Sequence, residues 1–458
     1  MLKKLTAWFR KKNIDMTQGP IGSRLVAFTV PILLGELFQH FYTLADSAII
    51  GNFAGRSALA AVGASESIVR VLVGFFNGVS VGFTVVIARH FGAKDTEKLN
   101  RSVNNALYLA LMIGILMTVS GLLLLRPVLR LMDTPEETFE NAVVYLTIYF
   151  AGILGFVLYN TAAGILHAVG DVQTPLCCLF LSSALNIGLD LLLVLVFHMG
   201  IAGVALATIV SQWVATALSL WVLLRRDYGF SVNPKQYPFH SKTAWLLLRM
   251  GIPTGFQKTI TSISNVLVLS RIISFGEACL AGWTIYGKLD NVLGVFAQSL
   301  GSALSTFVSQ NLGAKQYRRI ESGVRKTLLT GAILIGSLAA MLMLLRKPLV
   351  SLFSPDSEAV YFAELFVLSI SMFKLTQMFM CVYAGVLRGT GRMLLVTVIM
   401  LAGIVGFRQL YLLFITRSFN IPWLVGLSYP AGWCLAGLAL FFIYIFRVRR
   451  AWRRLEIQ

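Results

Sequence analysis

Acidic and polar residues interrupt the first long apolar stretch of the chain, residues 24–52. Five of them recur at steps of three, one, three and three, so that they fall on one side of a helix: Glu36, Gln39, His40, Thr43 and Asp46. A carboxylate near the middle of a membrane-spanning helix costs about 2.5–3.5 kcal/mol, so a stripe with two of them needs a reason. We expect this stripe to face a water-accessible cavity and Asp46 to bind a coupling cation.

A second polar set lies in the fifth and sixth apolar segments. Asn186 and Asp190 are four residues apart and therefore stack on one helix face. At a rise of about 1.5 Å per residue, they fall in the same outer layer of the membrane as Asp46 and Thr208. Two carboxylates, an amide and a hydroxyl suit a sodium ion, or a proton shared between acids. The alternative is a buried hydrogen-bond network that only holds helices together.

Two further groups are candidates for weaker reasons. Glu36 and His40 are one helical turn apart, and histidine changes charge near neutral pH, so they form a candidate proton relay. The alternative is a neutral histidine that is hydrogen-bonded to Glu36. The candidate substrate cavity gathers polar and basic residues from both halves: Gln39, Thr43, Asn160, Lys258, Asn265, Lys374, Gln377 and Arg408.

The interior of the second half is predicted to be basic. The simpler interpretation is that Lys288 pairs with Asp290 and that other basic side chains extend toward the membrane surface. The other interpretation is that Lys258, Lys374 or Arg408 contacts a negative group on a substrate, or pairs with Glu36 in one state of the protein.

Composition identifies the class of protein that carries these residues. Of 458 residues, 57% are hydrophobic and only 13% are charged, whereas roughly a quarter are charged in soluble domains. The chain is therefore a polytopic membrane protein. We find no phosphate loop, zinc-binding HExxH motif or nucleophile elbow, and the five cysteines lack metal-type spacing. We expect no enzyme activity, no cofactor, and no metal beyond a sodium ion at the coupling residues.

Twelve apolar segments are long enough to span a bilayer. They are residues 24–50, 57–87, 103–125, 140–166, 175–197, 200–224, 244–273, 278–309, 324–345, 358–387, 393–416 and 423–446. Basic residues predict their orientation, because cytoplasmic segments are enriched in lysine and arginine. With the amino terminus in the cytoplasm, 27 of the 39 basic residues lie on the cytoplasmic side. Both termini are thus expected inside a bacterial-type plasma membrane. The formal charge of +19 then reflects the membrane rim and contact with lipid headgroups, not nucleic-acid binding.

The two halves of the chain repeat one another at an offset of 221 or 222 residues. The matching landmarks are Pro31 with Pro253, Gly92 to Lys94 with Gly313 to Lys315, Pro127 with Pro348, Gly164 with Gly385, and Gly170 with Gly391. Six spans per half place both halves in the same orientation, related by an axis along the membrane normal. We therefore expect an all-α integral membrane fold of twelve transmembrane helices in two pseudo-two-fold related six-helix lobes.

The expected domain organisation has five parts. They are a cytoplasmic amino-terminal tail at 1–23, an N-lobe at 24–224, a cytoplasmic linker at 225–243, a C-lobe at 244–446 and a basic cytoplasmic tail at 447–458. Two bundles around a central cleft are typical of transporters that open to one side at a time.

The chain resembles the multidrug and toxic compound extrusion (MATE) transporter family over nearly its whole length. The resemblance rests on VPILLGELFQHFYTLADSAIIGNFAGRSALAAVG, on FGAKD and LGAKQ after the second and eighth segments, and on AGILHAVGDVQTP after the fourth. It implies drug–cation antiport by rocking of two lobes, and it implies that Asp46, Asn186 and Asp190, with Thr208, carry cation coupling. The pattern looks closer to the DNA-damage-inducible branch of the family.

The expected function is therefore secondary active efflux, in which drugs or other amphipathic organic compounds exchange for H+ or Na+. The partners are then a small organic substrate and membrane lipids, and the protein acts as a monomer. The alternative is a flippase or exporter of lipid-linked saccharides or another anionic amphiphile on the same architecture, since basic groups in the second half suit a diphosphate headgroup.

Overall fold

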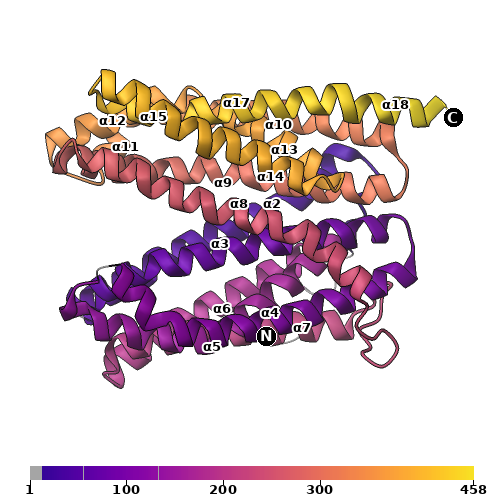
Figure 1. The fold of residues 1–458 in the computed structure, drawn as a ribbon, viewed down its shortest axis with the longest axis horizontal. Helices are drawn as coiled ribbons and strands as arrows, with labels where there is room; N and C mark the ends of the chain where they lie inside the picture. Colours follow the sequence, from indigo (N-terminus) through magenta and orange to yellow (C-terminus); the bar gives the residue numbers. More distant parts are fainter. Residues whose placement is uncertain (1–12, 55, 133, 458) are drawn as a thin grey trace. The chain divides into compact units, whose positions relative to one another are not determined.

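The structure, a computed structural model, describes residues 13–54, 56–132 and 134–457. Within these ranges, the side chains of residues 41, 44–48, 52, 54, 56–60, 64, 66–67, 416–417 and 456–457 lie outside the description. The described chain is helical, without a strand, as expected for a membrane protein whose backbone polar groups are satisfied within each span (Figure 1).

The first half consists of six long helices and two short π-helical segments. They are α2 (Ile21–Ile49), η1 (Ile50–Ala54), α3 (Arg56–Gly92), α4 (Thr96–Leu131), α5 (Glu136–Ala168), α6 (Gln173–Leu191), η2 (Leu192–Val196) and α7 (Gly200–Arg225).

The second half has more interruptions. Its elements are α8 (Ser241–Ile273), α9 (Glu277–Gly313), α10 (Tyr317–Leu344), α11 (Arg346–Ser351), α12 (Ser357–Ser371), α13 (Lys374–Gly389), α14 (Met393–Met400), η3 (Leu401–Phe407), α15 (Arg408–Ser418), α16 (Pro422–Gly426), α17 (Ser428–Ile443), η4 (Tyr444–Arg449) and α18 (Arg450–Ile457).

All twelve predicted segments fall on helical structure. By length and apolar composition, ten of the described helices qualify as spans, and the bent pair α12 and α13 makes an eleventh. Helix α8 covers the remaining predicted segment, 244–273. The prediction of one continuous span at 358–387 is wrong in detail, because α12 and α13 meet at an angle of 50°. This bend puts Lys374 at the start of a new helix.

The described chain forms two compact units, and each takes in the start of a helix from the other half of the sequence. One unit contains Val30–Gly251, and the other combines Met16–Thr29 with Ile252–Gln458. The change of unit lies within α2 and within α8, next to Pro31 and Pro253. Proline removes a backbone hydrogen bond inside a helix, so both changes occur where the helix is locally weakened. The predicted lobe boundaries at 24 and 244 instead mark the starts of these spans.

Helix α5 is the centre of the first unit, where it packs against α3, α4 and α7. Its contact with α3 is close enough for side chains to bond the facing backbone. The Ser80 hydroxyl donates to the Asn160 carbonyl at 2.7 Å, and the Thr84 hydroxyl donates to the Gly164 carbonyl at 3.1 Å. A Cβ atom at Gly164 would lie 2.5 Å from Ser80 Oγ, so only glycine fits there.

Helix α9 has the same place in the second unit, where it packs against α13, α12 and α10. Here two glycines bring the backbones together. A Cβ atom at Gly385 would lie 2.3 Å from the carbonyl oxygen of Gly301. The Ser309 hydroxyl also donates to the Gly389 carbonyl at 3.1 Å. Each unit therefore depends on one tightly packed helix pair between positions that the sequence repeat makes equivalent.

A buried aspartate joins the loop between α5 and α6 to the segment after α7. Asp171 accepts hydrogen bonds from the Thr174 hydroxyl at 2.7 Å, the Tyr228 hydroxyl at 2.6 Å and Arg226 Nη1 at 2.9 Å. Burial, and secondarily the Asp171 carboxylate, raise the pKa of the Tyr228 phenol, which therefore stays protonated and donating. The neighbouring exposed loop has a simpler pair, in which a hydrogen bond from Lys98 lowers the pKa of Asp95.

Candidate functional site

The polar pair of the first unit lies at the end of α6, one turn before the π-helical segment η2. Asn186 and Asp190 are both buried, and Asp190 has no exposed surface. When the amide is oriented to satisfy its neighbours, Asn186 Nδ2 lies 3.1 Å from Asp190 Oδ2, and its oxygen lies 3.3 Å from the Thr208 backbone nitrogen. The predicted one-turn stacking is thus present, and the amide also connects α6 to α7.

Thr208 contributes to this cluster through its backbone, whereas the sequence suggested a hydroxyl ligand. Its hydroxyl donates to the Val204 carbonyl of its own helix at 3.0 Å. That bond is common for threonine inside apolar helices, because it satisfies the hydroxyl locally. An ion that binds here would meet the hydroxyl oxygen as an acceptor only.

The stripe on α2 is described in part. The backbone of Asp46 belongs to the helix, but its side chain lies outside the described residues, so its distance to Asp190 is not part of this structure. Glu36 is half-buried, whereas Gln39, His40 and Thr43 are exposed on the surface of their unit. The Thr43 hydroxyl donates to the Gln39 carbonyl at 2.9 Å. Exposed polar groups on an apolar helix are consistent with the predicted contact with water.

The second unit contains a buried ion pair between α13 and α9. Lys374 Nζ lies 2.5 Å from Asp290 Oδ1 and 3.0 Å from Gln377 Oε1, and it stands 4.8 Å from the centre of the Trp433 ring. Asp290 also accepts a hydrogen bond from the Tyr286 hydroxyl at 2.5 Å. The Lys374 side chain is 1% exposed, so the two charges neutralise one another out of contact with water.

This pair corrects one prediction. Asp290 bonds to Lys374, not to Lys288, which is exposed and stands 5.5 Å from the centre of the Phe353 ring. Two residues that are two positions apart on a helix point to different sides, so Lys288 cannot easily reach Asp290. The packing of α13 against α9 brings the distant lysine there instead.

Arg408 is the other buried base of this unit, and it directly follows the π-helical segment η3. Its guanidinium donates to Asn265 Oδ1 at 2.8 Å and to Ser264 Oγ at 2.5 Å. It also stands 4.7 Å from the centre of the Tyr429 ring. These printed partners are all neutral, and Arg408 Nε has no hydrogen-bond partner within the described part of the chain. A buried cation held only by neutral groups attracts an anion.

The other predicted cavity residues lie apart from these groups. In the first unit, Asn160 is half-buried, and its amide donates to the Phe156 carbonyl at 2.8 Å. In the second unit, Lys258 is half-buried on α8, whereas Gln377 joins the Lys374 cluster and Asn265 joins the Arg408 cluster.

Three aromatic residues of the second unit were not among the predicted site residues. Tyr286, Tyr429 and Trp433 all contact a buried charge. Tyr286 had a sequence signal, because it precedes Asp290 by four positions and so shares its face. Tyr429 and Trp433 contact charges on other helices, and only the fold brings those together.

Comparisons with known proteins agree with this architecture. The sequence profile of the MatE family matches residues 31–192 and 253–411. The probable multidrug resistance protein YpnP of Bacillus subtilis is 30% identical over 389 residues, which cover 85% of this chain and 87% of that protein.

Solved structures share the fold at lower identity. An outward-facing multidrug resistance MATE family transporter of the MOP superfamily superimposes with a TM-score of 0.88 at 22% identity, covering 97% of this chain and 99% of the other. A MOP superfamily transporter from Pyrococcus furiosus, whose binding pocket is described as having reverse polarity, gives 0.86 at 23% identity with the same coverage.

Proposed function

Because this chain belongs to the MatE family, as its match to the family profile and to YpnP shows, we propose that it is a secondary active efflux transporter. It exchanges drugs or other amphipathic organic compounds for H+ or Na+ by alternating access. The family relationship favours drug efflux over the export of lipid-linked saccharides, and the relatives are transporters, not enzymes.

The observation that carries the coupling proposal is the buried pair on α6. A carboxylate with no exposed surface, one turn from an amide that also contacts α7, is costly inside an apolar bundle. Binding of H+ or Na+ removes that cost by neutralising Asp190. A change in charge at this contact also alters the bond network between α6 and α7, which gives the ion a means of favouring one state. Asp46 is proposed as the second carboxylate.

Counterflow in proteoliposomes tests the coupling. Asp190→Asn keeps the shape of the side chain and removes its charge, so we expect ion-driven dye efflux to fall to background while the folded protein is retained. The control is Asp227→Asn, the same exchange at an exposed loop residue of the same unit. Imposed pH and sodium gradients distinguish H+ from Na+. Normal gradient-driven efflux by Asp190→Asn would remove the proposal.

The buried base in the second unit supports a finer proposal about substrates. Arg408 has neutral printed partners, and Asn265 beside it is exposed, so an anionic group on a substrate can approach this position. We expect Arg408→Gln to weaken the uptake of anionic dyes about tenfold, as the loss of one charge-assisted hydrogen bond predicts, and to leave cationic dyes unchanged. Lys288→Gln, at an exposed base of the same unit, is the control. Equal effects on both dye classes would contradict this assignment.

We further propose that the protein lies in a bacterial plasma membrane with both termini in the cytoplasm and acts as a monomer. The distribution of lysine and arginine supports this orientation. A green fluorescent protein fused to the carboxyl terminus should fluoresce, while a fused alkaline phosphatase should stay inactive. The reverse pattern would contradict the orientation.

A further inference from the structure

Two helix starts at equivalent positions of the repeat are covered in different ways. Helix α4 begins at Thr96 and α10 begins at Tyr317, 221 residues later. The same offset relates Asn100 to Glu321 and Asn104 to Arg325. The first two turns of both helices thus present a side-chain row that faces the segment following the last span of its own half.

In the first unit that row is filled by protein. The segment after α7 runs over it, with Asn100 Oδ1 accepting from the Ser231 backbone nitrogen at 2.7 Å. Asn104 donates to the Ser231 carbonyl at 2.9 Å and accepts from the Asn233 nitrogen at 3.1 Å. Each asparagine therefore binds main chain and leaves no charge at this surface.

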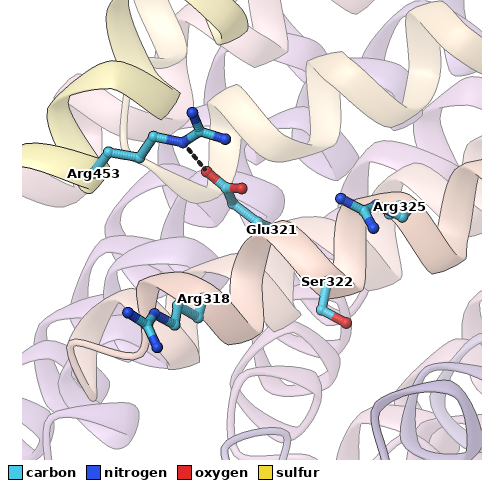
Figure 2. Close-up of a pocket in the computed structure, with 5 residues that line it drawn as sticks. All are labelled: Arg318, Glu321, Ser322, Arg325 and Arg453. Atoms are coloured by element: carbon cyan, nitrogen blue, oxygen red, sulfur yellow. Dashed lines mark ion pairs between the residues drawn. The ribbon is translucent and has the colours of Figure 1, made fainter. Parts of the chain in front are cut away.

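In the second unit the equivalent place is hollow and basic. A cavity of about 320 Å³ is lined by Arg318, Glu321, Ser322, Arg325 and Arg453. Figure 2 shows Arg453 reaching from α18 toward Glu321, with Arg318 and Arg325 on either side of that carboxylate along α10. The lining has three guanidinium groups and one carboxylate, and this carboxylate already binds Arg449 at 3.1 Å and Arg453 at 3.6 Å. The cavity therefore has an excess of positive charge.

The position of the cavity indicates what kind of anion can reach it. Both elements that line it border apolar spans, since α10 continues as one span and α18 ends the last one. Trp452 packs between Tyr317 and Tyr444, with ring centres 6.4 and 6.1 Å away, while the neighbouring Arg454 is exposed. Aromatic side chains next to basic ones are typical of the level of lipid headgroups.

We propose that this cavity binds the phosphodiester headgroup of an anionic membrane lipid. Arg325 and Arg453 bind the phosphate oxygens from two elements, because a guanidinium matches phosphate geometry with paired N–H groups. Ser322 offers a hydroxyl to the headgroup. The lipid takes the place that the segment after α7 takes in the first unit, and it connects the carboxyl-terminal helix to the start of α10. This site is independent of the proposed coupling residues.

The test uses the purified full-length protein in detergent, titrated with phosphatidylglycerol or with phosphatidylcholine of the same acyl chains. The readouts are the melting temperature and the lipid retained in native mass spectrometry. The variant is Arg325→Gln with Arg453→Gln, and the matched control is Lys326→Gln with Arg454→Gln, which removes two exposed charges one position further along the same helices.

We expect phosphatidylglycerol, but not phosphatidylcholine, to raise the melting temperature of the unmodified protein. A basic residue near an anionic headgroup contributes about 1 kcal/mol, or about fivefold in affinity, so the double variant should need roughly 25-fold more lipid. The control should stay within about twofold. Arg325→Gln alone, which keeps both bonds from the carboxyl-terminal arginines to Glu321, should need about fivefold more lipid without a change in the lipid-free melting temperature.

Three results would overturn the proposal. Equal losses in the variant and its control would indicate diffuse attraction to charge and not a site. Equal stabilisation by the two lipids would exclude recognition of an anionic headgroup. Stabilisation by inorganic phosphate at the concentration at which phosphatidylglycerol acts would assign the cavity to a soluble phosphate.

Discussion

Removing the charge of Lys374 should destabilise the second unit strongly. The ammonium group is 1% exposed and neutralises Asp290, so Lys374→Met leaves a carboxylate with the Tyr286 hydroxyl as its remaining printed partner. Breaking a buried ion pair from one side costs roughly 3–5 kcal/mol. Because the Asp290 side chain is 20% exposed, we take the lower end, about 3 kcal/mol. For a unit of this size, that predicts a fall in melting temperature of about 6–12 °C.

The assay is thermal unfolding followed with a thiol-reactive dye, since Cys279 is buried and becomes reactive when the second unit unfolds. Lys288→Met is the control, because it removes the same group from an exposed residue of α9. The double variant Lys374→Met with Asp290→Asn removes both charges together, and it should recover at least half of the loss.

Two outcomes would refute this reasoning. A fall no larger for Lys374→Met than for Lys288→Met would mean that the ion pair contributes nothing. A double variant that is less stable than either single variant would mean that the two residues act through separate contacts.

Three further predictions concern stability. Asp171→Asn should lower the melting temperature by several degrees, because a buried carboxylate that accepts charged and hydroxyl donors is worth about 3 kcal/mol; an unchanged value would contradict the assigned bonds. The raised pKa of Tyr228 means that its stabilisation is complete below about pH 10 and is lost as pH rises through the folded value, so between pH 8 and 11 the melting temperature of the unmodified protein should fall more steeply than that of Tyr228→Phe; parallel curves would count against it. Gly385→Ala should cost about 1–3 kcal/mol because its Cβ would lie 2.3 Å from the Gly301 carbonyl oxygen, whereas Gly336→Ala, with 3.8 Å of clearance, should be neutral in the same unfolding assay.

Periodicity and repetition predicted much of the fold. Apolar length alone located the twelve segments, and the offset of 221 residues correctly relates the starts of α4 and α10. The one-turn spacing of Asn186 and Asp190 likewise predicted their contact, since residues four apart share a helix face. These features depend only on local geometry, which the order of the residues determines.

The contacts that the sequence did not predict depend on packing between distant helices. Lys374 and Asp290 are 84 positions apart, and the bend between α12 and α13 sets the direction from which the lysine arrives. Arg408 similarly finds Ser264 and Asn265 on α8. No pattern along the chain encodes such a pair, because many helix arrangements bury the same apolar faces.

The sharing of α2 and α8 between the compact units bears on how such a protein originated. Each unit is complete only with a helix start encoded in the opposite half of the gene, namely Met16–Thr29 for one and part of α8 for the other. An ancestor with a single six-helix half would have had to trade these terminal turns with a sister copy, as domain-swapped dimers do. Gene duplication then joined the swapped partners into one polypeptide, and the polar linker between them closed an exchange that already existed.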